Sequence, residues 1–164
     1  MMLSTLETMV RGVWHFSFTV SDLERSIDFY CRLLGMRLVH RQEQANPYTR
    51  TLVGYADASL RVAQLTIDGA AAGPSGHLLE LVQYLAPAHP PHPPGTAFPN
   101  SAHMAFAVDD LQAAYQKLAG EGVRFCSEPV AITAGINQGG FAVYFRDPDG
   151  ITLEMVQPSR RSGD

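Results

Sequence analysis

Two histidines and two glutamates in this sequence have types and spacing that suit metal chemistry. They occur in the order His15, Glu80, His103 and Glu154. Both glutamates lie within apolar strand-like segments, and burying a carboxylate without a partner costs several kcal/mol. Each glutamate therefore needs a cation or hydrogen-bond donors. Two imidazoles and two carboxylates form a mixed nitrogen and oxygen ligand set, which suits Ni, Co, Mn, Fe or Zn.

The four residues belong to an internal repeat. The segment HFSFTVSDL at 15–23 aligns with HMAFAVDDL at 103–111, and LELVQ at 79–83 aligns with LEMVQ at 153–157. The histidine precedes the glutamate by 65 residues in the first half and by 51 in the second. The difference of 14 residues predicts an extra loop in the first half, around 43–58.

Each half is predicted to fold in the order βαβββ. The first strand alternates in each half, so that His15 and His103 lie on a polar or small face opposite an apolar one. A helix then begins at Ser21 or Asp22 in the first half, and at Asp109 or Asp110 in the second. The expected strands are 14–20, 36–41, 60–67 and 78–84, then 103–108, 123–125, 141–145 and 151–156, and the expected helices are 23–34 and 111–118.

The length of 164 residues fits one α+β domain built from two such modules. The first module spans 13–85, a proline-rich linker spans 86–100, and the second module spans 101–157. A module that folds as an open sheet exposes an apolar face and a strand edge, and both need cover. We therefore expect a homodimer.

Charge and composition exclude several classes of protein. The net charge of −4 and the lack of a basic run argue against nucleic-acid binding. No stretch approaches the ~20 apolar residues that span a bilayer, and the first residues lack the apolar core of a signal peptide. The two cysteines form no metal or redox motif. We expect a cytoplasmic protein that acts on or binds a small molecule.

These motifs resemble the vicinal oxygen chelate superfamily, which includes glyoxalase I, methylmalonyl-CoA epimerase, extradiol dioxygenases and the fosfomycin and bleomycin resistance proteins. The resemblance covers about 13–157 and is clearest in HFSFTVSDLERSIDFY, in HMAFAVDDL and in FRDPDGITLE. It implies paired βαβββ modules whose mixed sheets form a cupped half-barrel around a divalent metal. It also implies that the metal ligands are the four residues of the repeat: His15, Glu80, His103 and Glu154.

Among these relatives, the His-Glu-His-Glu set is most similar to that of glyoxalase I, a lyase. In that mechanism the metal holds two oxygens of a hemithioacetal and stabilises a cis-enediolate. A glutamate moves the proton between neighbouring carbons. By resemblance Glu154 is the catalytic base, and Glu80 is its counterpart on the opposite side.

Two other functions remain open from the sequence: an Fe-dependent extradiol dioxygenase, and a binding protein for an antibiotic or another small molecule. Extradiol enzymes typically have histidine where Glu80 stands. The positions that hold glutathione in glyoxalase I read Phe18-Thr19 and Gln83-Tyr84 here. Further candidates for contact with the substrate are Arg61, Tyr144 and Arg146.

Overall fold

The computed structural model describes residues 10–67, 78–93 and 95–159. The chain divides into two compact units between Pro90 and Pro91, a point inside the predicted linker. Each unit has a mixed sheet and few helices, which confirms the predicted α+β class. No helix in the described part of the chain is long and apolar enough to cross a membrane.

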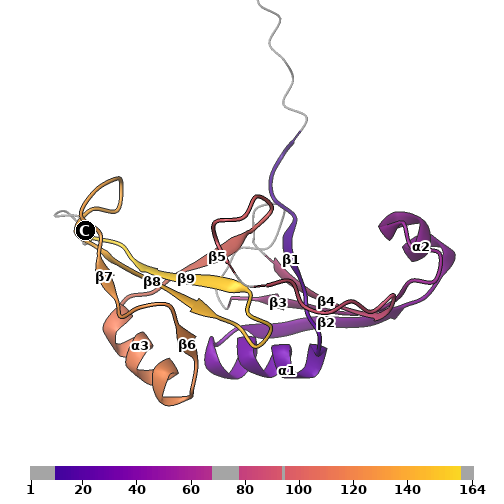
Figure 1. Ribbon diagram of the computed structural model, residues 1–164, viewed down its shortest axis with the longest axis horizontal. Helices are drawn as coiled ribbons and strands as arrows, with labels where there is room; N and C mark the ends of the chain where they lie inside the picture. The colour runs from indigo at the N-terminus through magenta and orange to yellow at the C-terminus, as the bar shows by residue number, and fades with distance from the viewer. Residues whose placement is uncertain (1–9, 68–77, 94, 160–164) are drawn as a thin grey trace, which may run out of the picture. The chain divides into compact units, whose positions relative to one another are not determined.

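The first unit contains a sheet of four strands in the order β1-β4-β3-β2 (Figure 1). Strand β1 runs parallel to β4, and the other neighbouring pairs are antiparallel. The elements are β1 (His15–Thr19), α1 (Leu23–Asp28), the π-helical turn η1 (Phe29–Leu33), β2 (Arg37–Gln44), α2 (Pro47–Val53), β3 (Ser59–Thr66) and β4 (Leu78–Ala86).

The second unit repeats this topology without a counterpart of α2. Its path of paired strands is β5-β9-β8-β6, in which β5 is parallel to β9 and β7 pairs with β8 off the path. The elements are β5 (His103–Ala107), α3 (Leu111–Gly120), β6 (Arg124–Phe125), β7 (Val130–Ala131), β8 (Phe141–Arg146) and β9 (Thr152–Gln157).

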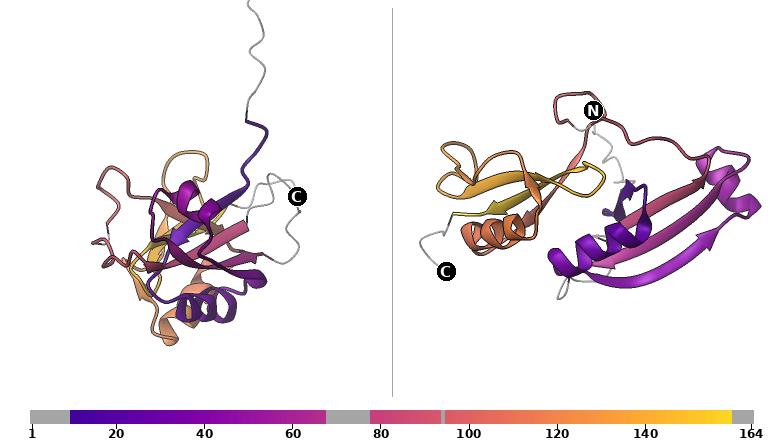
Figure 2. Two further views of the ribbon diagram at one scale, coloured as in Figure 1. Left: turned by 90° about the vertical axis from the view of Figure 1, so that its right-hand side faces the viewer. Right: turned by 60° about the horizontal axis from the view of Figure 1, so that its bottom comes forward.

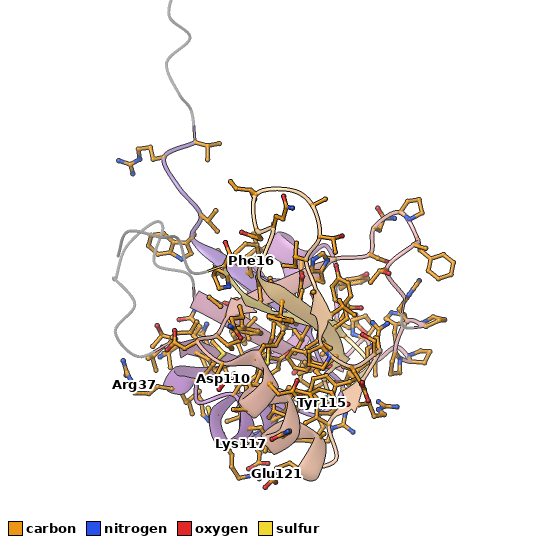
Figure 3. The ribbon with its side chains drawn as sticks, turned by 90° about the vertical axis from the view of Figure 1, so that its left-hand side faces the viewer. Phe16, Arg37, Asp110, Tyr115, Lys117 and Glu121 are labelled. Atoms are coloured by element: carbon orange, nitrogen blue, oxygen red, sulfur yellow. The ribbon has the colours of Figure 1, made fainter. Side chains whose placement is uncertain are left out.

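The repeated aspartate and glutamine fix the start of the helix in each unit. Asp22 and Asp110 are the N-caps, and each side chain accepts a hydrogen bond from the backbone N–H three residues on. Gln83 Oε1 accepts from Leu23 N, and Gln157 Oε1 accepts from Leu111 N. The glutamine that ends each LE-x-VQ segment therefore ties the helix to the last strand. Figure 3 shows Asp110 at the start of α3 and Glu121 beyond its other end.

In each unit one face of the sheet packs against the helix and forms the core (Figure 2). Alternation along β3 and β4 places Ala63, Leu65, Leu79 and Leu81 on this face, and all four are fully buried. The corresponding residues of the second unit are Val143, Phe145, Leu153 and Met155. The opposite face of each sheet is therefore the one available for a site.

The predicted loop at 43–58 was wrong in part, because this segment contains helix α2. Asn46 caps the helix by accepting from Thr49 N, Pro47 occupies its first turn, and Gly54 ends it with a φ of 78°. Val53 of α2 packs on the buried cluster of Leu60, Val62 and Val82. The extra residues of the first half thus cover one end of the sheet face opposite α1.

Three other details differ from the sequence predictions. The first helix ends in the π-helical turn η1, and the two-residue strand β7 was not predicted. The apolar side of β1 is only partly covered, since Phe16 is 45% exposed and Trp14, just before the strand, is 67% exposed. Among the strands of the described residues, β1 is the edge of its sheet and pairs with β4 alone. The apolar alternation of this segment therefore predicts more burial than the edge strand has.

Candidate functional site

The first unit brings His15 and Glu80 together on the sheet face opposite α1. Ser17 lies directly opposite Glu80 in the parallel β1–β4 pair, and His15 is two residues earlier on the same face. His15 Nε2 lies 3.8 Å from Glu80 Oε1. The Glu80 side chain is 18% exposed, so it is mostly but not fully buried.

The second unit reproduces this arrangement with His103 and Glu154. Ala105 is opposite Glu154 in the parallel β5–β9 pair, and His103 Nε2 lies 3.2 Å from Glu154 Oε2. The Glu154 side chain is 17% exposed. Both His–Glu pairs follow from one topology, because the last strand of each unit returns beside the first in parallel.

Gln64 is a member of the first site that the sequence analysis missed. It lies opposite Glu80 in the antiparallel β3–β4 pair, and its Nε2 donates a hydrogen bond of 3.1 Å to Glu80 Oε2. The signal in the sequence is a polar residue on the same strand face as the buried Leu60 and Val62. Detecting it requires the register between β3 and β4, which the sequence alone does not supply.

Tyr144 occupies the corresponding position opposite Glu154 in the second unit. Its ring meets the His103 ring edge-on, with centroids 5.3 Å apart and planes at 88°. Partial burial, and then the negative charge of Glu154, raise the pKa of the Tyr144 phenol above its ordinary value. The tyrosine therefore remains a neutral hydroxyl near the His103–Glu154 pair.

The structure places the two arginines predicted to contact substrate very differently. Arg146 lies on the Glu154 face, two residues beyond Tyr144 on β8, and its guanidinium donates to Thr152 Oγ1. Arg61 lies on the opposite face of its sheet from His15 and Glu80, because its neighbour Val62 shares their face.

Ion pairs on the helix side hold Arg61. It lies 3.2 Å from Glu24 of α1 and 3.4 Å from Glu43 of β2, and Arg41 also pairs with Glu24 at 2.7 Å. These contacts link α1 to two strands of the sheet. Arg61 therefore lies on the helix side of its sheet, away from the His15–Glu80 pair, and its contact with a substrate stays a prediction.

The chemistry of each pair fits a divalent metal, although neither pair is a complete site. Imidazole nitrogen and carboxylate oxygen are ordinary ligands of Zn, Ni, Co, Mn and Fe. Within the described ranges no cluster of three or more His, Cys, Asp or Glu residues is present. Each unit thus holds one histidine and one glutamate side by side.

Comparison with known proteins identifies the family of this chain. The model of the glyoxalase/bleomycin resistance protein/dioxygenase superfamily matches residues 12–155. The chain belongs to this superfamily. The match includes both His–Glu pairs and all thirteen elements from β1 onward, except the end of β9.

Individual relatives agree with this assignment. The chain is 34% identical over 149 residues to a 2-epi-5-epi-valiolone epimerase from an Actinomyces species, covering 88% of this chain and 78% of the relative. It is 34% identical over 157 residues to the lactoylglutathione lyase of Haemophilus influenzae, covering 92% and 96%. A glyoxalase family protein from Bacillus cereus has the same fold, with a TM-score of 0.77 at 18% identity, covering 95% and 99%.

Proposed function

We propose that this protein is a divalent-metal-dependent lyase or isomerase of the glyoxalase type. Its substrate would be a small molecule with two neighbouring oxygens. The observation that carries the proposal is the recurrence of one His–Glu pair at the same place in both units, at 3.8 Å and 3.2 Å. One relative is named as a lactoylglutathione lyase and another as an epimerase, which supports lyase or isomerase chemistry.

His15, Glu80, His103 and Glu154 would hold the metal. When bound, the ion polarises two neighbouring oxygens of the substrate and makes the adjacent C–H more acidic. Glu154 accepts that proton and returns it to the neighbouring carbon. Glu80 remains a ligand on the other side of the site. Tyr144 and Arg146, which share the Glu154 face, would contact the substrate.

A complete site needs two units, and these come from one chain or from two chains. We propose a homodimer, because β1 and β5 are edge strands of the sheets in the described part of the chain, and Phe16 on β1 and Trp14 just before it are exposed. Sedimentation velocity at micromolar concentration checks this proposal. A monomer at that concentration would contradict it.

Metal analysis of the purified chain, followed by a substrate panel, tests the function. We expect about one divalent ion per His-Glu-His-Glu set, and turnover that is lost on chelation and restored by metal. The panel should contain hemithioacetals of α-ketoaldehydes and cyclic α-hydroxy ketones. A chain without stoichiometric metal would refute the proposal.

Two further results would favour the other functions of this superfamily. Oxygen consumption with a catechol after anaerobic loading with Fe(II) would indicate a ring-cleaving dioxygenase. Tight binding of a ligand after full chelation, without turnover, would indicate a binding protein.

A further inference from the structure

The groups opposite the two glutamates distinguish one carboxylate from the other. Glu80 and Glu154 occupy the same position in the repeat, and each has a directly opposed residue on the antiparallel neighbouring strand. That residue is Gln64 in the first unit and Tyr144 in the second. An amide can donate a hydrogen bond to a carboxylate without changing its own charge. The two sites are therefore chemically different at this position.

Contacts restrain both oxygens of the Glu80 carboxylate. Gln64 Nε2 donates to Oε2 at 3.1 Å, and His15 Nε2 lies 3.8 Å from Oε1. Gln64 projects from β3, the strand between β4 and β2, so its backbone is fixed by hydrogen bonds on both sides. Rotation of the Glu80 carboxylate away from His15 would break the hydrogen bond to the amide. Glu80 is thus restrained with Oε1 toward His15.

Glu154 has a tyrosine, not an amide, at the directly opposed position. His103 Nε2 lies near Oε2, whereas in the described part of the chain no hydrogen bond joins Tyr144 to either oxygen of Glu154. The Tyr144 ring instead packs edge-on against His103. A carboxylate that carries a proton to and from a substrate has to move, and among the described residues Glu154 lacks the amide hydrogen bond that restrains Glu80.

We infer that Gln64 is a positioning residue that holds Glu80 as the stationary metal ligand and thereby leaves proton transfer to Glu154. This inference rests on the proposed function, since it concerns ligands of the proposed metal. Groups that hydrogen-bond to metal ligands typically change metal affinity by about 10–100-fold when they are removed. Gln64 should therefore affect metal binding even when no substrate is present.

Metal affinity of the full-length protein is the measurement that tests the inference. The metal-stripped chain is titrated with Zn²⁺ or Co²⁺ against a chelating indicator. We expect Gln64→Met, which keeps the length of the side chain but removes the donor, to weaken binding about tenfold. Gln64→Asn, which keeps the amide but shortens its reach, should weaken binding similarly and serves if the methionine variant does not fold.

Gln42→Met is the matched control, because Gln42 is on β2 opposite Val62 and on the same sheet face. We expect it to leave metal affinity within about twofold, as for substitutions away from a site. Thermal unfolding of the metal-free variants separates affinity from folding. A loss of stability with unchanged affinity would mean that Gln64 only satisfies a half-buried carboxylate, and would overturn the inference.

A double-mutant cycle distinguishes action through Glu80 from a general effect. In a Glu80→Gln background, Gln64→Met should cause no further loss of metal affinity. In a Glu154→Gln background, it should still cause the full loss of about tenfold. An equal loss in both backgrounds would overturn the positioning role.

The same titration separates this inference from the proposed function. A wild-type chain that binds no divalent metal refutes the proposed function and the positioning role with it. A wild-type chain that binds metal, together with a Gln64→Met variant that binds it equally well, refutes the positioning role alone.

Discussion

The two units place the same His–Glu pair on the same scaffold but surround it differently. Strand β3 offers Gln64 opposite Glu80, and strand β8 offers Tyr144 opposite Glu154. The first unit also has α2, which covers one end of the sheet face with Val53. The internal repeat thus preserves the histidine and the glutamate while the neighbouring positions diverge. This difference supports the proposal that Glu80 acts as a metal ligand and Glu154 as the proton carrier.

The largest expected effect is the loss of turnover when Glu154, the proposed catalytic base, is replaced. Glu154→Gln should lower turnover by about two to four orders of magnitude, the usual contribution of a positioned general base. Glu80→Gln should be milder, because an amide oxygen can still ligate a metal. The measurement is kcat on the substrate that the panel identifies. Near-native turnover of Glu154→Gln together with an inactive Glu80→Gln would reverse the two roles.

Metal binding should depend on both units alike. His15→Ala and His103→Ala each remove a proposed ligand. We expect each to weaken metal binding by more than about 100-fold, which exceeds the usual effect of removing a group that only hydrogen-bonds to a ligand. Chelator competition measures the affinity, and elemental analysis measures the stoichiometry. If stoichiometric metal remained in the double variant, the repeat would not form the metal site.

The helix attachments offer a comparison in stability. Gln83 makes two hydrogen bonds, to Leu23 N at 3.2 Å and to the Ser21 carbonyl at 2.9 Å, whereas Gln157 accepts one from Leu111 N at 2.8 Å. Each hydrogen bond contributes about 1 kcal/mol. Gln83→Ala should therefore lower the free energy of unfolding by about 2 kcal/mol, and Gln157→Ala by about 1 kcal/mol. Urea unfolding checks the order, which equal losses would contradict.

Arg61→Ala should give the smallest effect. The Arg61 side chain is 33% exposed and pairs with the exposed Glu24 and Glu43, and such surface pairs contribute less than about 1 kcal/mol. Because Arg61 is on the helix side, KM should stay within about twofold of the wild-type value. A large rise in KM with unchanged kcat would restore its predicted contact with the substrate.

The sequence predicted those parts of the fold whose signals lie within a few neighbouring residues. Period-two alternation, the aspartate caps and the DPDG turn all act within a few residues, and they located the strands other than β7 and the two main helices. Asp147 Oδ1 accepts from Asp149 N and Ile151 N in this turn. Helix α2 is the element that the repeat does not predict, since the second unit has no matching segment in its described residues, although Asn46 and Pro47 are an ordinary helix start.

By itself the sequence determined the repeat, and with it the two histidines and two glutamates, since a buried carboxylate is costly wherever the chain folds. Tertiary structure decided which side chains surround each pair. The face of Arg61, the hydrogen bond from Gln64 to Glu80 and the packing of Tyr144 on His103 all depend on strand register. A shift of one residue in register moves every side chain to the other face, and long-range pairing between strands sets that register.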